Sequence, residues 1–441
     1  MEVVVQVAQL LLALSILVGI HEGGHMIAAR MFGMRVEKFF IGFPPTIFSF
    51  KKGDTEYGLG AVPLGGFVKI SGMIDESMDK EQMKQEPQPW EFRSKPAWQR
   101  LIVMLGGIIV NVVAGIIAMI ILTYNLGDQY IPSLYPKENG VIAYEYAQEM
   151  GFETGDKIID VNGEDYEAFR DLTALDMFLS EGSYYTIERN GQRQKLTVPT
   201  TFLNTMSSDD EFLQKFLMPR FGFEISLDGA IEPTAATFGM QEGDNITQIG
   251  DQRIKFADEL RPALAIYSGQ EVPITVKRNG SEIVLDGRVK ADSTLGVVTI
   301  LDSEIGRNEY TFGQAVTKGT VDAFGLVIDN ARALGKMFTG DLSPRSLSGP
   351  IGIFKIFPKT WDWNKFWERT AFISMILAFM NLLPIPALDG GHVVFLLFEM
   401  VSGKAPSDKF LENAQKVGMV ILLALMVFVF GNDILKEIFG I

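Results

Sequence analysis

The sequence predicts a membrane α-helical fold that carries a soluble α+β insertion made of two similar copies. Four apolar stretches have the length of membrane-spanning helices. Between the second and the third, residues 128–309 hold 32 Asp and Glu against 16 Lys and Arg, a net charge of −16, while the whole chain carries −15. A short motif in this acidic block recurs 88 residues later, which indicates a duplicated domain.

The four membrane helices are predicted at 1–32, 98–126, 369–402 and 414–440. Each offers roughly the 20 helical residues that cross a hydrocarbon core of ~30 Å. The third is interrupted by Pro384 and Pro386. The first is too long for a cleaved signal peptide and has no small-residue cleavage site, so we interpret it as a true span.

The distribution of basic residues predicts the orientation of these helices. Eleven Lys and Arg lie from Arg30, at the end of the first span, to Arg100, at the start of the second, and none precedes the first span. Because basic loops remain in the cytoplasm, we expect residues 33–97 there and both termini and the acidic block outside. In a Gram-negative cell this means a multi-pass inner-membrane protein with a periplasmic insertion. An acidic insertion also argues against nucleic-acid binding through a basic face.

Within the cytoplasmic loop, "TEYGLGAVPLGGFVKI" (55–70) alternates as a pair of strands would. Its apolar centre, which includes Gly65 and Gly66, favours strands over the alternative of a plain loop. A strand edge at this position could pair with an extended peptide.

The two copies in the insertion are related by matched motifs. The matched pairs are "GFETGDKIIDVNG" (151–163) with "GMQEGDNITQIGD" (239–251), and "TIERNG" (186–191) with "TVKRNG" (275–280). The pattern resembles PDZ domains, which implies two PDZ-like α+β domains at 127–219 and 220–308. Such domains bind peptide C-termini or extended segments by adding a strand to a sheet edge. A role as spacers or steric covers is the alternative.

Residues 309–345 are predicted to form an amphipathic helix, because their apolar residues recur at helical spacing. The helix suits a position at the membrane surface, and packing against protein is equally compatible with the pattern. In the loop that follows (346–368), Trp361, Trp363 and Trp367 cluster as an interfacial belt would.

The first span contains the motif His21-Glu22-Gly23-Gly24-His25. On a helix, this spacing sets both imidazoles on one face, where they can share a zinc ion. Zinc lowers the pKa of a bound water to about 7, and Glu22 can take a proton from that water. Because ionisable groups in a span are costly and usually functional, this motif predicts a metal-assisted amide hydrolase.

A catalytic zinc usually has three protein ligands, and the interrupted third segment supplies the candidates Asp389 and His392. Eighteen residues separate Val3 from His21, and 21 separate Glu368 from Asp389. At ~1.5 Å per helical residue, both paths descend about 27–32 Å from the outer face. The two sites can therefore meet near the cytoplasmic side.

Together these motifs closely resemble the RseP-type site-2 proteases. The resemblance covers nearly the whole chain and includes the sequence "NLLPIPALDGG" (381–391). It implies zinc held by His21, His25 and Asp389, with Glu22 as the general base. It also implies a substrate cleft shaped by Asn381, Pro384 and Pro386, with His392 as a neighbour of the metal site.

Other expectations follow from the same resemblance. The stretch 55–70 corresponds to the family's membrane-associated β-hairpin. In the second span, the family's Gly-Pro-x-x-Asn reads Gly107-Ile108-Ile109-Val110-Asn111, so the asparagine is present without the proline. Implied substrates are single-span membrane proteins in the lipid bilayer, namely anti-sigma factors in regulated intramembrane proteolysis and leftover signal peptides.

Two other classes of protein are weighed against the protease. A catalytically inactive membrane scaffold that displays PDZ domains would not need the intact Glu22. A transporter that uses carboxylates in the membrane is disfavoured, because four spans without an inverted repeat do not match such folds.

Overall fold

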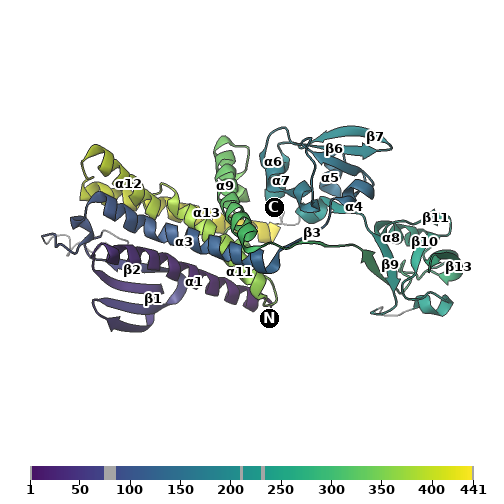
Figure 1. The fold of residues 1–441 in the computed structure, drawn as a ribbon, viewed down its shortest axis with the longest axis horizontal. Coiled ribbons are helices and arrows are strands. Elements are labelled where there is room, and N and C mark those ends of the chain that lie inside the picture. The colour runs from purple at the N-terminus through teal and green to yellow at the C-terminus, as the bar shows by residue number, and fades with distance from the viewer. Residues whose placement is uncertain (1, 74–85, 209–211, 230–233, 440–441) are drawn as a thin grey trace. The chain divides into compact units, whose positions relative to one another are not determined.

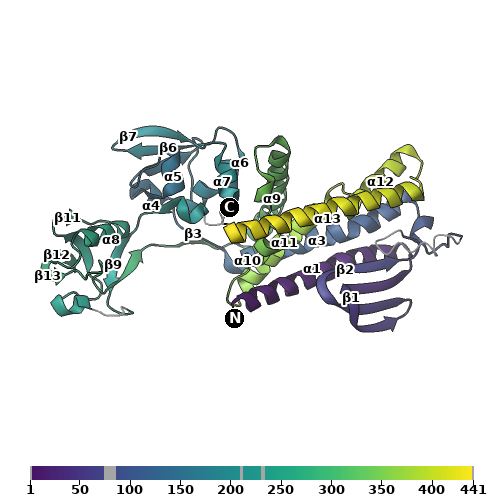
Figure 2. The same cartoon turned by 180° about the vertical axis from the view of Figure 1, so that it is seen from behind.

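The computed structural model describes residues 2–73, 86–208, 212–229 and 234–439. The chain divides into two compact units (Figures 1 and 2). The helical unit comprises Met1–Gly127 and Glu309–Ile441, and the insertion unit comprises Asp128–Asn308.

The helical unit is organised around α3. Its helices are α1 (Glu2–Met31), α3 (Ala97–Leu126), α9 (Phe312–Thr339), α10 (Pro350–Lys355), α11 (Trp363–Leu382), α12 (Asp389–Ser402) and α13 (Asp408–Phe439), with short 3₁₀ turns at Phe92–Ser94 and Pro344–Ser346. Helix α3 runs antiparallel to α1 and α11 and contacts both, as well as α9 and α12 (Figure 1).

Three helices in the described part of the chain are long and apolar enough to cross a membrane. They are Glu2–Met31, Ala97–Leu126 and Lys409–Ile438. The third segment, which the sequence predicts to be interrupted, is divided between α11 and α12, and neither half alone reaches both the required length and the required hydropathy. Proline lacks a backbone N–H and clashes with the preceding turn, so Pro384 and Pro386 end the first half.

Helices α1 and α3 cross in backbone contact. A Cβ atom on Gly24 would lie 2.3 Å from the carbonyl oxygen of Gly106, and a Cβ on Gly106 would lie 2.7 Å from that of Gly24. Only glycine on both helices permits this approach, which occurs within one turn of His21 and next to His25.

Strands β1 (Val36–Lys52) and β2 (Thr55–Ile70) form an antiparallel sheet next to α1. Both strands bend, so that Phe40 of β1 lies opposite Phe67 and also opposite Gly58. The two halves of β2 therefore flank the same segment of β1. The half that contains Phe67 has no second strand partner among the described residues, so it forms an open edge.

The expected strand pair within 55–70 is therefore wrong. This stretch is one bent strand, and its hairpin partner is Val36–Lys52. The turn lies at Gly53, whose φ of +63° suits a glycine. Glycines in the middle of 55–70 instead allow the strand to bend, because a Cβ on Gly60 would lie 2.3 Å from the carbonyl oxygen of Phe43.

Helix α9 begins at a capping box formed by Thr311 and Gln314 and ends at the left-handed Gly340. Its small residues face α3 and are buried, namely Ala315, Gly319 and Ala323. Six of its large apolar residues are exposed, namely Phe312, Val316, Val321, Phe324, Ile328 and Phe338. The helix lies across the direction of α3 (Figure 1), so one face packs on protein and another offers an apolar surface.

The segment between α9 and α11 is held by buried polar side chains. On α13, Asp433 accepts hydrogen bonds from the backbone N–H groups of Gly349, Ile351 and Gly352 at 2.9, 2.9 and 3.2 Å. On α1, Gln6 and Gln9 donate to the carbonyls of Phe357 and Pro358, each at 2.8 Å. The hydrogen bonds of Gln6 and Gln9 explain why these two polar residues occupy an otherwise apolar span.

The insertion unit contains short helices and several small sheets. Its first part comprises β3 (Asp128–Tyr130), α4 (Leu134–Glu138), β4 (Val141–Ala143), α5 (Glu145–Met150), β5 (Lys157–Val161), α6 (Leu175–Leu179), β6 (Tyr184–Arg189), β7 (Gln192–Thr197), α7 (Phe202–Ser208) and β8 (Leu217–Pro219). Its second part comprises β9 (Gly222–Ser226), β10 (Asn245–Ile249), β11 (Gln252–Arg253), α8 (Ala257–Ile266), β12 (Glu271–Arg278), β13 (Ser281–Arg288), β14 (Val298–Asp302) and β15 (Gly306–Asn308).

The repeated sequence motif forms the same buried ion pair twice. Arg189 binds the buried carboxylate of Asp156 through two hydrogen bonds of 2.6 Å, and Arg278 binds Asp244 through two of 2.7 Å. The two aspartates lie 88 residues apart and the two arginines 89 apart, as in the matched motifs. The duplication is thus visible in the structure as well as in the sequence.

Candidate metal centre

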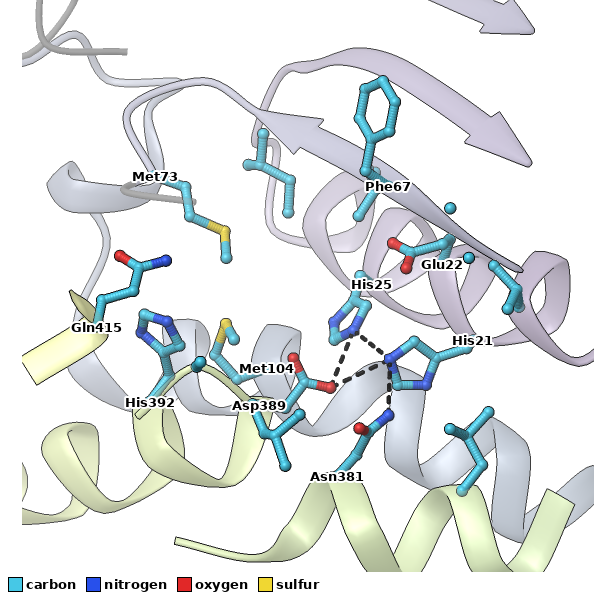
Figure 3. Close-up of a pocket in the computed structure, with 18 of the residues that line it drawn as sticks. His21, Glu22, His25, Phe67, Met73, Met104, Asn381, Asp389, His392 and Gln415 are labelled. Carbon is cyan, nitrogen blue, oxygen red and sulfur yellow. Dashed lines mark hydrogen bonds and ion pairs between the residues drawn. The ribbon is translucent and has the colours of Figure 1, made fainter. Parts of the chain in front are cut away.

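Helix α1 brings three groups of its His-Glu-x-x-His motif to one cavity. His21 and His25 are four residues apart, both are buried, and their rings meet edge to face at 4.8 Å. Glu22 also lines this cavity, on the side of β2 (Figure 3).

Three possible ligand atoms form a near-equilateral triangle (Figure 3). His21 Nε2 lies 3.2 Å from His25 Nε2, and Asp389 Oδ2 lies 3.2 and 3.3 Å from these two nitrogens. Atoms bound tetrahedrally at ~2.0–2.1 Å to one zinc ion are about 3.3 Å apart. The triangle therefore has the dimensions of one face of a zinc coordination tetrahedron.

The chemistry of the three donors also fits a cation. Asp389 Oδ2 is buried and, although it lies within ion-pair distance of both rings, accepts no well-formed hydrogen bond. A buried carboxylate oxygen without a partner is costly. A zinc ion would satisfy this oxygen and both imidazole nitrogens together, and no other described group of three His, Asp or Glu residues is arranged to hold a metal.

A tight turn presents Asp389 to the histidines. A Cβ on Gly390 would lie 2.3 Å from the carbonyl oxygen of Leu383, and one on Gly391 would lie 2.4 Å from Cα of Pro386. On α13, a Cβ on Gly418 would lie 2.6 Å from the backbone nitrogen of Ala387. Glycine is therefore required on both sides of the turn that fixes the carboxylate.

The predicted substrate residues divide into two groups. Asn381, at the end of α11, points its amide nitrogen toward His21 Nε2 at 3.3 Å and lines the cavity (Figure 3). Gly65 and Gly66 also line the cavity. Pro384 and Pro386 are not among its lining residues, and they belong to the turn that precedes Asp389.

The cavity has a volume of about 510 Å³ and runs along the open edge of β2. A Cβ on Gly66 would lie 2.6 Å from both the carbonyl oxygen of Phe40 and Val18 Cγ1, and 3.5 Å from Cγ of Glu22, so glycine lets β2 pack closely against α1 beside the glutamate. His392 lines the same cavity on the other side of Asp389, next to Gln415 (Figure 3). His392 does not belong to the group of three clustered donors.

Sequence reasoning assigned no role to the residues of α3 behind the histidines. His25 Nδ1 lies 2.8 Å from the carbonyl oxygen of Val103, and His21 Nδ1 lies 3.3 Å from the amide nitrogen of Asn111. An asparagine in an apolar span could have indicated such a contact. A contact with a backbone carbonyl cannot be predicted from residue types, because every residue has this group.

Comparison with known proteins gives a consistent result. The model of peptidase family M50 matches residues 9–425. "Regulator of sigma E protease" from Haemophilus influenzae is 30% identical over 97% of this chain and 98% of its own length. "Regulator of sigma-E protease RseP" from Escherichia coli is 28% identical over 97% of both chains. "Zinc metalloprotease RasP" from Oceanobacillus iheyensis is 29% identical over 97% of this chain and 98% of its own length.

The family resemblance and the zinc cofactor expected from the motifs are confirmed by these matches. The matches also favour an active enzyme over the inactive scaffold. The chain belongs to peptidase family M50, as an intramembrane zinc metalloprotease of the RseP type.

Proposed function

We propose that this protease hydrolyses peptide bonds within the transmembrane segments of single-span membrane proteins, with zinc held by His21, His25 and Asp389. The observation that carries the proposal is the triangle of Nε2, Nε2 and Oδ2 atoms with sides of 3.2, 3.2 and 3.3 Å. Glu22, which shares their cavity, is the proposed general base.

Zinc, when bound, would polarise the scissile carbonyl and acidify the attacking water. Glu22 would take a proton from that water as its oxygen bonds to the carbonyl carbon. It would then return the proton to the amide nitrogen as the carbon–nitrogen bond breaks. Asn381 lies beside His21, where its amide N–H group can donate to the substrate carbonyl. Glu22 would thus transfer the proton, and Asn381 would orient the substrate.

The open edge of β2 is the proposed substrate-binding strand. A transmembrane helix satisfies its own backbone hydrogen bonds and must unwind before an amide can be attacked. The unwound segment could then pair with β2 at Gly65 and Gly66, which border the cavity.

We further propose four membrane helices, with α11 and α12 together forming the third. The termini and the insertion unit would face the periplasm, with the zinc site near the cytoplasmic side of the inner membrane. The eleven basic residues from Arg30 to Arg100 support this orientation. The exposed apolar face of α9 would lie at the periplasmic surface of the inner membrane.

The insertion unit is proposed to be two PDZ-like domains, 127–219 and 220–308, which restrict entry to substrates already trimmed outside the membrane. Binding of peptide C-termini by these domains is the second possibility. Strands β3 and β15 pair, so the first and last residues of the unit, Asp128 and Asn308, are neighbours. A deletion of 128–308 closed by a short linker should permit cleavage of an untrimmed substrate. If the deletion variant still discriminates by outer-domain size, the filter is located elsewhere.

The names of the relatives suggest the substrate class. Two are named for the regulation of sigma E, so we propose membrane-bound anti-sigma factors as substrates, and the family resemblance alone adds leftover signal peptides. The decisive experiment on the activity is Glu22→Gln, assayed with a model single-span substrate. It should retain zinc and lose cleavage, whereas cleavage at the parental rate would remove Glu22 from the mechanism.

A further inference from the structure

Both imidazoles of the metal centre have their second ring nitrogen in contact with α3. For His25, Nδ1 lies 2.8 Å from the carbonyl oxygen of Val103. For His21, Nδ1 lies 3.3 Å from Nδ2 of Asn111, a residue with no solvent exposure. One helix therefore lies behind both proposed ligands.

Metal binding fixes which nitrogen of each ring carries the proton. A neutral imidazole has one N–H donor and one acceptor nitrogen, and Nε2 of both rings faces the metal position. Each Nδ1 must then carry the proton and donate it. The carbonyl of Val103 can accept from His25, but the amide nitrogen of Asn111 cannot accept from His21.

The amide oxygen of Asn111 is the acceptor that remains. This Oδ1 atom is buried and has no hydrogen-bond partner. Turning the amide about its Cβ–Cγ bond would exchange Nδ2 for Oδ1 at the His21 ring. It would give the Nδ1–H group its acceptor without moving either helix.

We infer that Asn111 is a positioning residue, whose amide oxygen accepts the His21 Nδ1–H bond and thereby fixes the metal-binding tautomer and ring orientation of His21. The inference rests on the proposed ligand set of His21, His25 and Asp389. Partners of this kind commonly change metal affinity by 10–100-fold when removed.

The surrounding packing holds Asn111 in place. One turn earlier on α3, a Cβ on Gly107 would lie 2.5 Å from His25 Nε2 and 2.6 Å from His21 Cε1, so glycine alone lets the helix approach the rings. The hydroxyl of Ser374 on α11 donates to the backbone carbonyl of Asn111 at 2.8 Å. Both contacts restrict the position from which the amide can reach His21.

The test compares Asn111→Leu with Asn111→Asp in the full-length, detergent-solubilised protein. Zinc affinity is measured by competition with a chromophoric chelator, and ring geometry from the visible spectrum of the cobalt(II)-substituted protein. We expect Asn111→Leu to bind zinc about 10–100-fold more weakly and to alter the cobalt spectrum. Asn111→Asp, which keeps an acceptor oxygen of the same reach, should bind at least as tightly as the parent.

Thr370→Val is the matched control, because it removes a buried hydrogen bond that lies within α11 and involves neither imidazole nor Asn111. It should retain the zinc affinity of the parent. Parental affinity in Asn111→Leu, or equal weakening in Asn111→Asp and Asn111→Leu, would overturn the inference. A separate His21→Ala variant tests the ligand set itself, and undiminished zinc binding there would reject the ligand set, whatever the Asn111 variants do.

Discussion

Replacing Gly24 with alanine should separate α1 from α3 and damage the metal centre, although Gly24 touches neither zinc nor substrate. The new Cβ would lie 2.3 Å from the carbonyl oxygen of Gly106, whereas real Cβ contacts are essentially never shorter than 3.0 Å. The helices must therefore move apart by roughly 1 Å at the point where His25 donates to Val103. A misplacement of about 1 Å can cost on the order of 10²-fold in rate.

The neighbouring glycine provides a matched control. A Cβ on Gly23 would meet nothing within 4 Å, and both substitutions gain the same helix propensity of about 1 kcal/mol. Cleavage of a model single-span substrate in proteoliposomes should fall by about 10–100-fold in Gly24→Ala and remain near the parental rate in Gly23→Ala. Equal rates in the two variants would show that the close helix crossing does not position the histidines.

Three further predictions address other parts of the molecule. Gly66→Val should lower cleavage at least about tenfold, because its Cβ would lie 2.6 Å from both the carbonyl oxygen of Phe40 and Val18 Cγ1 and would displace the edge of β2 from beside Glu22; cleavage at the parental rate would contradict this. Asp433→Ala should destabilise the protein by about 1–3 kcal/mol, measured by thermal unfolding in detergent, since it leaves three backbone N–H groups unpaired. Asp433→Asn, which keeps one acceptor, should cost less. Burial alone would raise the pKa of Asp244, but hydrogen bonds from Arg278 and the backbone hold it below its ordinary value. This contribution to the free energy of unfolding is present at neutral pH and is lost as the pH falls through the lowered pKa. The free energy of unfolding of Asp244→Asn should therefore depend less on pH in acid than that of the parent.

The metal centre was largely predictable because its residues are chemically conspicuous. Histidines and a glutamate are costly in an apolar span and are usually functional there. The rise per residue of a helix was enough to predict that Asp389 and His21 lie at the same depth in the membrane. The structure places the proposed ligand atoms of His21, His25 and Asp389 within 3.3 Å of one another. The division of the third segment also followed from the sequence, since Pro384 and Pro386 cannot continue a helix.

Other features depended on contacts that a linear pattern does not carry. Alternation in 55–70 identified extended structure but not its partner, because the turn at Gly53 gives a weaker signal than the glycines inside the strand. The support of His25 by Val103 uses a backbone carbonyl, which every residue has. Gln6 and Gln9 were visible as polar residues in a span, but their partners lie some 350 positions away.

The central claim is that one zinc ion is bound by His21, His25 and Asp389, and the zinc content of the purified, unchelated protein tests it most directly. We expect close to one zinc per chain in the parent and in Glu22→Gln, and almost none in Asp389→Ala. A full equivalent of zinc in Asp389→Ala, or none in the parent, would contradict the account.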